Sequence, residues 1–170
     1  PSLNIQTQSI EIFEVLPKIK NAKHGTLSKS QIERIVNFGG YEKEFEEKSV
    51  ALLLDEIFPY LSEGKMLSLD ISPVTLRNNH FKSYITTLFR EKKVNPHFFI
   101  LEISEKNSYE DMARFREILL SYKESGFQIA LGNFGGNNCG FEYLKHLPID
   151  LVKFDIKIKK KLGEAKYAQV

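Results

Sequence analysis

Residues 98–103 read Phe-Phe-Ile-Leu-Glu-Ile, an apolar run that contains a single carboxylate. A continuous apolar run is typical of a strand covered on both faces, as in a parallel sheet flanked by helices. Similar short runs alternate along the chain with segments of helical periodicity. This alternation predicts βα units and a mainly parallel sheet, which is either an open doubly wound sheet or a barrel.

The alternation assigns most of the chain to strands or helices. The apolar runs predict strands at residues 10–16, 66–71, 98–103, 127–131 and 149–154. Amphipathic spacing predicts helices at residues 28–38, 43–60, 80–92, 108–124 and 139–146, and a further helix from Lys157. A complete barrel has eight strands and about 250 residues, so a barrel built by this chain would be partial.

Length and composition narrow the classes of protein. The chain has 170 residues, of which 42% are hydrophobic, so it can form one domain with a sizeable core. The net charge of +2 favours neither nucleic acid nor membrane binding. Cys139 is the only cysteine, which excludes an internal disulfide and is typical of a reducing compartment. We therefore expect a single cytoplasmic domain over residues 1–170, with no membrane contact by this segment, although the parent protein can be membrane-attached.

Four of the predicted strands carry an ionisable residue near their end: Glu14, Asp70, Glu102 and Lys153. The carboxyl ends of parallel strands lie at the same edge of a sheet, where active sites form. Carboxylates among apolar neighbours need a cation or hydrogen-bond donors, and Lys153 is the nearest candidate. Their oxygens suit Mg²⁺, Mn²⁺ or Ca²⁺. The alternative is that these acids only cap strands or pair with Lys and Arg.

Five motifs occur in an order that resembles the EAL domain family. They are Glu14-Val15-Leu16, Ser68-Leu69-Asp70-Ile71-Ser72-Pro73, Leu101-Glu102-Ile103-Ser104-Glu105, Gly132-Asn133-Phe134-Gly135, and the run from Tyr143 to Asp155. EAL domains are bacterial phosphodiesterases or receptors for cyclic di-GMP. The resemblance implies a TIM-type (β/α) barrel with an irregular first strand. It also implies an incomplete barrel, because the family's N-terminal strand and last two βα units are not evident.

The resemblance further implies roles for individual residues. Glu14, Asp70 and Glu102 match metal-ligating positions for Mg²⁺ or Mn²⁺, and Glu14 and Lys153 match catalytic positions. Contacts to cyclic di-GMP would come from Leu16, Lys18 and Lys153. Lys18 stands where the family has an arginine, and it keeps the charge but loses the bidentate fork. Phe134, Gly135, Gly136 and Asn137 fall in the loop that the family uses for dimer contacts and metal occupancy.

Two departures from the family pattern bear on catalysis. Gly132 and Asn133 stand where the family has an Asp-Asp pair, and Gly132 offers no side-chain oxygen. Because even second-shell changes weaken metal sites by about 10–100-fold, we expect a two-metal centre to be lost or weak. The resemblance then implies a degenerate member, a non-catalytic regulatory domain that binds cyclic di-GMP weakly or docks a protein partner, with Mg²⁺, Mn²⁺ or no cofactor. An active phosphodiesterase that gives the linear dinucleotide, and a pure interaction or dimerisation scaffold, remain as alternatives.

Overall fold

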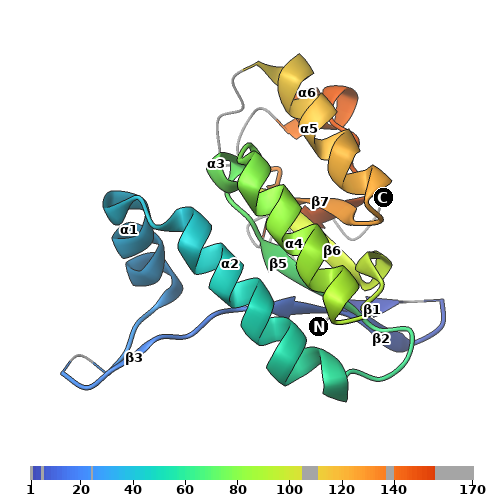
Figure 1. Cartoon of the computed structure of the whole chain (residues 1–170). Coiled ribbons are helices and arrows are strands. Elements are labelled where there is room, and N and C mark those ends of the chain that lie inside the picture. The colour runs from blue at the N-terminus through green and yellow to red at the C-terminus, as the bar shows by residue number, and fades with distance from the viewer. Residues whose placement is uncertain (1, 5, 24, 105–110, 137–139, 156–170) are drawn as a thin grey trace, which may run out of the picture.

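The computed structural model describes residues 2–4, 6–23, 25–104, 111–136 and 140–155 (Figure 1). Within them, the main sheet has the strand order β1-β2-β5-β6-β7-β8. Its strands are β1 (Ser2–Asn4), β2 (Ser9–Val15), β5 (Met66–Asp70), β6 (Phe99–Ser104), β7 (Gln128–Phe134) and β8 (Leu151–Phe154). Strands β2 to β8 of this sheet pair in parallel and in chain order. The five strands predicted from the apolar runs are therefore confirmed.

The sequence does not predict strand β1, which pairs antiparallel with β2 through Ser2↔Ile12 and Asn4↔Ser9. This strand is too short to show a hydrophobic period, and its backbone pairing with β2 is what defines it. A small hairpin follows β2, formed by β3 (Lys20–Asn21) and β4 (Gly25–Thr26). Figure 1 shows this hairpin and the helix after it extending away from the sheet.

The predicted helices form with shifted ends. They are α1 (Lys29–Gly39), α2 (Glu42–Leu52), α4 (Asn79–Glu91), α5 (Met112–Glu124) and α6 (Gly140–His146), with the short α3 (Pro73–Leu76) and η3 (Pro96–Phe98) between them. The helix predicted at 43–60 changes its hydrogen bonding, becoming a π-helix at η1 (Leu53–Ile57) and a 3₁₀ turn at η2 (Phe58–Tyr60). Pro59 has no N–H to continue an α-helix. The predicted helix starts at 108 and 139, and the helix from Lys157, lie outside the described residues.

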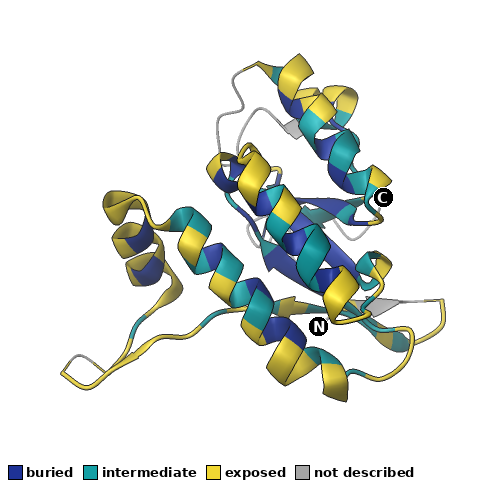
Figure 2. Ribbon diagram, in the orientation of Figure 1, coloured by how far each residue is buried: buried dark blue, intermediate teal, exposed yellow. Residues whose placement is uncertain are grey.

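The main core lies between the sheet and helices α2, α4 and α5, which Figure 1 shows over one face of the sheet. Helix α4 buries Phe81, Ile85 and Phe89, which recur every four residues along one side. The Phe89 ring packs edge-on against Phe99, with ring centroids 4.6 Å apart. Figure 2 shows the buried residues concentrated in the central strands and on the inner sides of these helices. Each such side chain contributes about 1.5–3 kcal/mol of burial free energy.

The strand predicted to stop before Gly132 continues further, so that expectation is wrong. β7 runs to Phe134, and its register with β8 shifts between Leu131 and Phe134. Asn133 has a φ of 57°, in the left-handed region that asparagine tolerates better than most residues. Phe134, which follows this irregularity, is buried, and the centroid of its ring lies 5.7 Å from that of Phe154. Among the described residues, no helix is both long and apolar enough to cross a membrane.

Candidate ligand site at the carboxyl ends of the strands

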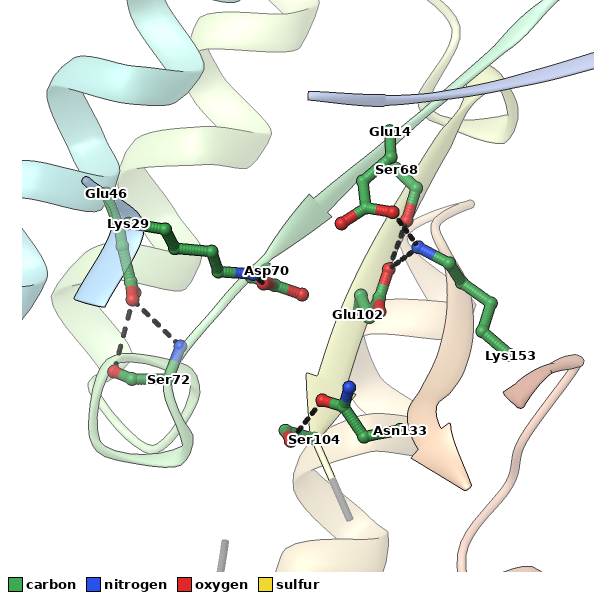
Figure 3. Close-up of polar contacts among 10 residues, drawn as sticks. All are labelled: Glu14, Lys29, Glu46, Ser68, Asp70, Ser72, Glu102, Ser104, Asn133 and Lys153. Atoms are coloured by element: carbon green, nitrogen blue, oxygen red, sulfur yellow. Dashed lines mark hydrogen bonds and ion pairs between the residues drawn. The ribbon is translucent and has the colours of Figure 1, made fainter. Parts of the chain in front are cut away.

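Lys153 joins two carboxylates from distant strands. Its Nζ donates to Glu14 Oε2 at 2.8 Å and to Glu102 Oε2 at 2.5 Å (Figure 3). Glu14 lies in β2 and Lys153 in β8, with three strands between them in the sheet. A flat sheet would hold these residues far apart, because neighbouring strands are about 4.8 Å apart. The contact therefore shows that the sheet curls, as part of a barrel wall does. The expectation that Lys153 is the counter-ion of the strand-end acids is confirmed for Glu14 and Glu102 and is wrong for Asp70, which is bonded to Lys29.

Glu102 is the most deeply buried acid of this cluster, with 6% of its surface exposed. Its Oε2 also accepts a hydrogen bond from the buried Ser68 Oγ at 2.8 Å. Burial and the nearby charge of Asp70 raise the pKa of Glu102, against the opposing effects of Lys153 and Ser68. Burial alone would lower the pKa of Lys153, but its bonds to Glu102 and Glu14 outweigh burial and raise it. Lys153 is therefore a firmly charged ammonium at neutral pH.

Asp70 is paired with a different lysine. Lys29 Nζ donates to Asp70 Oδ2, and Figure 3 shows the Lys29 side chain reaching Asp70 from helix α1. Burial alone would lower the pKa of Lys29, but Asp70 and the charges of Glu33 and Glu14 raise it overall. The sequence does not single out Lys29, because its contact depends on where α1 lies against the sheet. The only local signal is the helix start, since Ser28 is a capping residue that makes Lys29 the first residue of α1.

Gly132 leaves a space that Glu102 fills. A Cβ atom at residue 132 would lie 2.2 Å from Glu102 Oε1 and 3.0 Å from Glu102 Cδ. Gly132 therefore permits the carboxylate of Glu102 to lie where it bonds to Lys153 and Ser68. The neighbouring Asn133 accepts a hydrogen bond from Ser104 Oγ at 2.9 Å through its Oδ1.

A groove of about 660 Å³ opens beside these acids. It lies between helices α1 and α2 and the carboxyl ends of β2, β5 and β6. Its walls include Leu16, Lys29, Asp70, Glu102 and Asn133. This volume is within the range of small-molecule sites, about 300–1,000 Å³. The groove therefore offers a ligand access to the charged cluster.

The remaining predicted site residues lie at different places. Lys18 is exposed in the segment between β2 and β3 and is not among the residues that line the groove. Phe134 is a core residue, and the centroid of its ring lies 5.3 Å from that of Phe141. Gly135 has a φ of 78°, and Gly136 donates its N–H to Asn133 O at 3.1 Å, so both belong to a tight turn after β7. Asn137 lies outside the described residues.

The three predicted metal ligands do not form a ready metal site. Glu14 and Glu102 are bonded to Lys153, Asp70 is bonded to Lys29, and Gly132 supplies no oxygen. Among residues that the structure describes, no group of three or more His, Cys, Asp or Glu side chains is placed to hold a metal ion. A two-metal centre would have to displace both ammonium groups, so the residues as arranged do not fit one.

The sequence model of the EAL domain matches residues 1–170 of the chain. The chain belongs to the EAL domain family. This EAL domain is 24% identical over 145 residues to cyclic di-GMP phosphodiesterase PdeA of Borreliella burgdorferi, a match that covers 84% of this chain and 22% of the relative. It is 24% identical over 164 residues to the uncharacterized EAL-domain containing protein YkuI of Bacillus subtilis, covering 91% of this chain and 38% of that protein. The chain thus spans well under half the length of either relative.

Solved structures show the same fold. The Xanthomonas citri FimX EAL domain in complex with c-di-GMP gives a TM-score of 0.79 at 15% identity, covering 94% of this chain and 64% of that chain. The PaMucR phosphodiesterase in complex with c-di-GMP gives a TM-score of 0.71 at 20% identity, covering 91% of this chain and 64% of that chain. At these identities the likeness concerns the fold alone. The TIM-type fold of the EAL domains, expected from the resemblance, is thereby confirmed for the curled parallel sheet of the described residues.

Proposed function

We propose that this EAL domain binds cyclic di-GMP without hydrolysing it, as a regulatory domain in bacterial cyclic di-GMP signalling. The observation that carries this proposal is the position of the Glu102 carboxylate. It fills the space beside Gly132 and is bonded to Lys153 and Ser68, where a catalytic centre of this family would need free oxygen ligands.

The loss of hydrolysis follows from the requirements of two-metal chemistry. Two cations about 4 Å apart lower the pKa of a bound water and stabilise both the attacking and the leaving oxygen. Mg²⁺ demands near-ideal octahedral geometry, so it tolerates missing ligands poorly. In this domain Lys153 already neutralises Glu14 and Glu102, and a cation there would have to displace an ammonium group held by two carboxylates. Efficient activation of water is therefore not expected.

Retention of the nucleotide is supported by the groove and by the relatives. The groove of about 660 Å³ leads to the strand ends. The FimX and PaMucR EAL domains with the same fold are described as complexes with c-di-GMP. Among the lining residues, Leu16 offers an apolar contact and Lys29 a cationic one. We propose that a dinucleotide occupies this space with weak affinity, because Lys18, which stands where the family has an arginine, does not line the groove.

Two assays on the full chain test the proposal. Calorimetry with cyclic di-GMP measures binding in EDTA and again with Mg²⁺ or Mn²⁺, and chromatography of the incubated nucleotide detects the linear dinucleotide. We expect binding without product under all three conditions. A linear product whose formation is abolished in Glu14→Ala would overturn the non-catalytic assignment. A lack of any binding heat, together with an unchanged melting temperature at saturating nucleotide, would overturn the assignment of the ligand.

A further inference from the structure

We infer that Lys29 is a binding residue for the phosphodiester group of the ligand, and that it lets the groove take an anionic ligand without a divalent cation. This inference rests on the proposed function, because it concerns the same groove. It adds a residue and an electrostatic role that the family motifs do not indicate.

Lys29 is held at the groove by the start of helix α1. Ser28 is the N-cap, and its side chain and that of Gln31 form a reciprocal capping box. Gln31 Oε1 accepts from Ser28 N at 2.8 Å, which fixes the first turn. Ser28, Lys29 and Ser30 all line the groove. The side chain of Lys29 remains 51% exposed although its ammonium is bonded to Asp70, so it is accessible to a ligand.

Lys29 provides the positive charge that an anionic ligand needs in a groove that several acidic residues line. The acidic residues that line the groove are Glu33, Glu46, Asp70 and Glu102, whereas Lys29 is the only Lys or Arg among the described lining residues. A phosphodiester brought into this wall would meet repulsion from the carboxylates, because like charges in a partly desolvated site repel strongly. Lys29 neutralises Asp70 and presents positive charge to the groove. Lys153 neutralises Glu102 from the other side.

The ammonium group of Lys29 can bridge a carboxylate and a phosphate. It has three N–H donors, and within the described residues its hydrogen-bond partner is Asp70. The remaining donors can point toward a phosphate oxygen while the bond to Asp70 holds the side chain in place. A cation that bridges a protein carboxylate and a phosphate is also the arrangement a divalent metal ion would supply. Binding of the anionic ligand should therefore survive chelation of metal ions.

Calorimetry with cyclic di-GMP in EDTA tests this role on the full chain and four variants. Lys29→Met removes the charge, and Lys29→Arg keeps it. Lys29→Met combined with Asp70→Asn separates a phosphate contact from mere neutralisation of Asp70. Lys20→Met is the matched control, since Lys20 is an exposed lysine in the β3–β4 hairpin outside the groove lining. Melting temperatures of all variants check that each one is folded.

We expect Lys29→Met to weaken binding about tenfold or more, as for loss of a charge-assisted hydrogen bond. Lys29→Arg should keep most of the affinity, Lys20→Met should match the wild type, and the double variant should remain weak. Recovery of wild-type affinity in the double variant would overturn the inference, since Lys29 would then only neutralise Asp70. Unchanged affinity in Lys29→Met, or wild-type binding that requires Mg²⁺ or Mn²⁺, would also overturn it. Absence of wild-type binding would instead refute the proposed function.

Discussion

The Nζ atom of Lys153 lies 2.8 Å from Glu14 Oε2, although β8 and β2 are separated by three other strands of the sheet. The pair spans 139 residues of sequence. It forms only because the sheet curls, so the ion cluster and the curvature of the sheet depend on each other. Glu102, from the central strand β6, completes the cluster and is the most buried of its members.

Lys153→Met should destabilise the fold, because it leaves Glu14 and the buried Glu102 without their shared cation. Removing one partner of a buried pair costs about 3–5 kcal/mol, and the partial exposure of Lys153 and Glu14 reduces this to about 2 kcal/mol. Urea unfolding at pH 7 measures the effect. Adding Glu102→Gln to Lys153→Met should recover most of the loss. A single variant as stable as the wild type would show that the cluster contributes no net stability.

Gly132→Ala should also be destabilising, by about 1–3 kcal/mol. The added methyl group would lie 2.2 Å from Glu102 Oε1 and would push this carboxylate off Lys153. A double-mutant cycle with Glu102→Ala isolates the clash, since the three heavy atoms nearest to an added Cβ at residue 132 all belong to the Glu102 side chain. We expect Gly132→Ala to cost little in the Glu102→Ala background. If Gly132→Ala lost the same stability in the wild type and in Glu102→Ala, the need for glycine would come from the backbone of β7 and not from the Glu102 side chain.

Glu46 should make stability depend on pH. This buried residue of α2 accepts from Ser72 N at 2.9 Å, and burial raises its pKa to about 7 despite hydrogen bonds from Thr75 and Ser72. The folded state therefore holds a proton that the unfolded state releases near pH 4.5, so this contribution to stability is lost as the pH rises from about 4.5 to 7. Glu46→Gln should be about 2 kcal/mol more stable than the wild type at pH 8 and nearly equal at pH 4.

The control for Glu46 is Glu44→Gln on the exposed side of the same helix. Thermal unfolding between pH 5 and pH 8 should give parallel curves for Glu44→Gln and the wild type, because a backbone hydrogen bond and Lys43 lower the pKa of Glu44 from 4.5 and keep its titration below this range. The curve for Glu46→Gln should be flatter. A Glu46→Gln variant that is less stable than the wild type at pH 8 would show that the carboxylate is charged and needed in that position.

Asn133 should tolerate glycine better than alanine. Its φ of 57° is unfavourable for alanine by about 1–2 kcal/mol, whereas glycine adopts it readily. Both substitutions lose the hydrogen bond from Ser104 Oγ. The Ala variant should therefore be less stable than the Gly variant by about 1 kcal/mol in urea unfolding. The reverse order would contradict a left-handed backbone at this position.

The parallel strands and most helices could be predicted from the sequence because each carries a clear hydrophobic period. Met66–Asp70 and Phe99–Ser104 are buried on both faces and read as apolar runs. β1 could not be predicted, because three residues paired through their backbone leave no period. The extension of β7 past Gly132 could not be predicted, because a left-handed Asn133 within a strand breaks the usual pattern.

Some contacts of the site could also be predicted from the sequence, and others could not. The pairing of Lys153 with Glu14 and Glu102 follows from the rule that strand ends meet and that buried acids need a cation. The pairing of Asp70 with Lys29 could not be predicted, since it depends on where an exposed helix lies across the groove. Nor does the sequence reveal that Glu102 occupies the space at Gly132, because this is a matter of side-chain direction between neighbouring strands.

The contact between β2 and β8 has a consequence for synthesis on the ribosome. Glu14 emerges early and Lys153 is added 139 residues later, so a nascent chain that ends within β7 exposes the acids of the cluster before their ammonium exists. Non-local contacts of this span form late in folding. The last described strand supplies the ammonium that pairs with Glu14 and Glu102, so this cluster is complete only once β8 has left the exit tunnel.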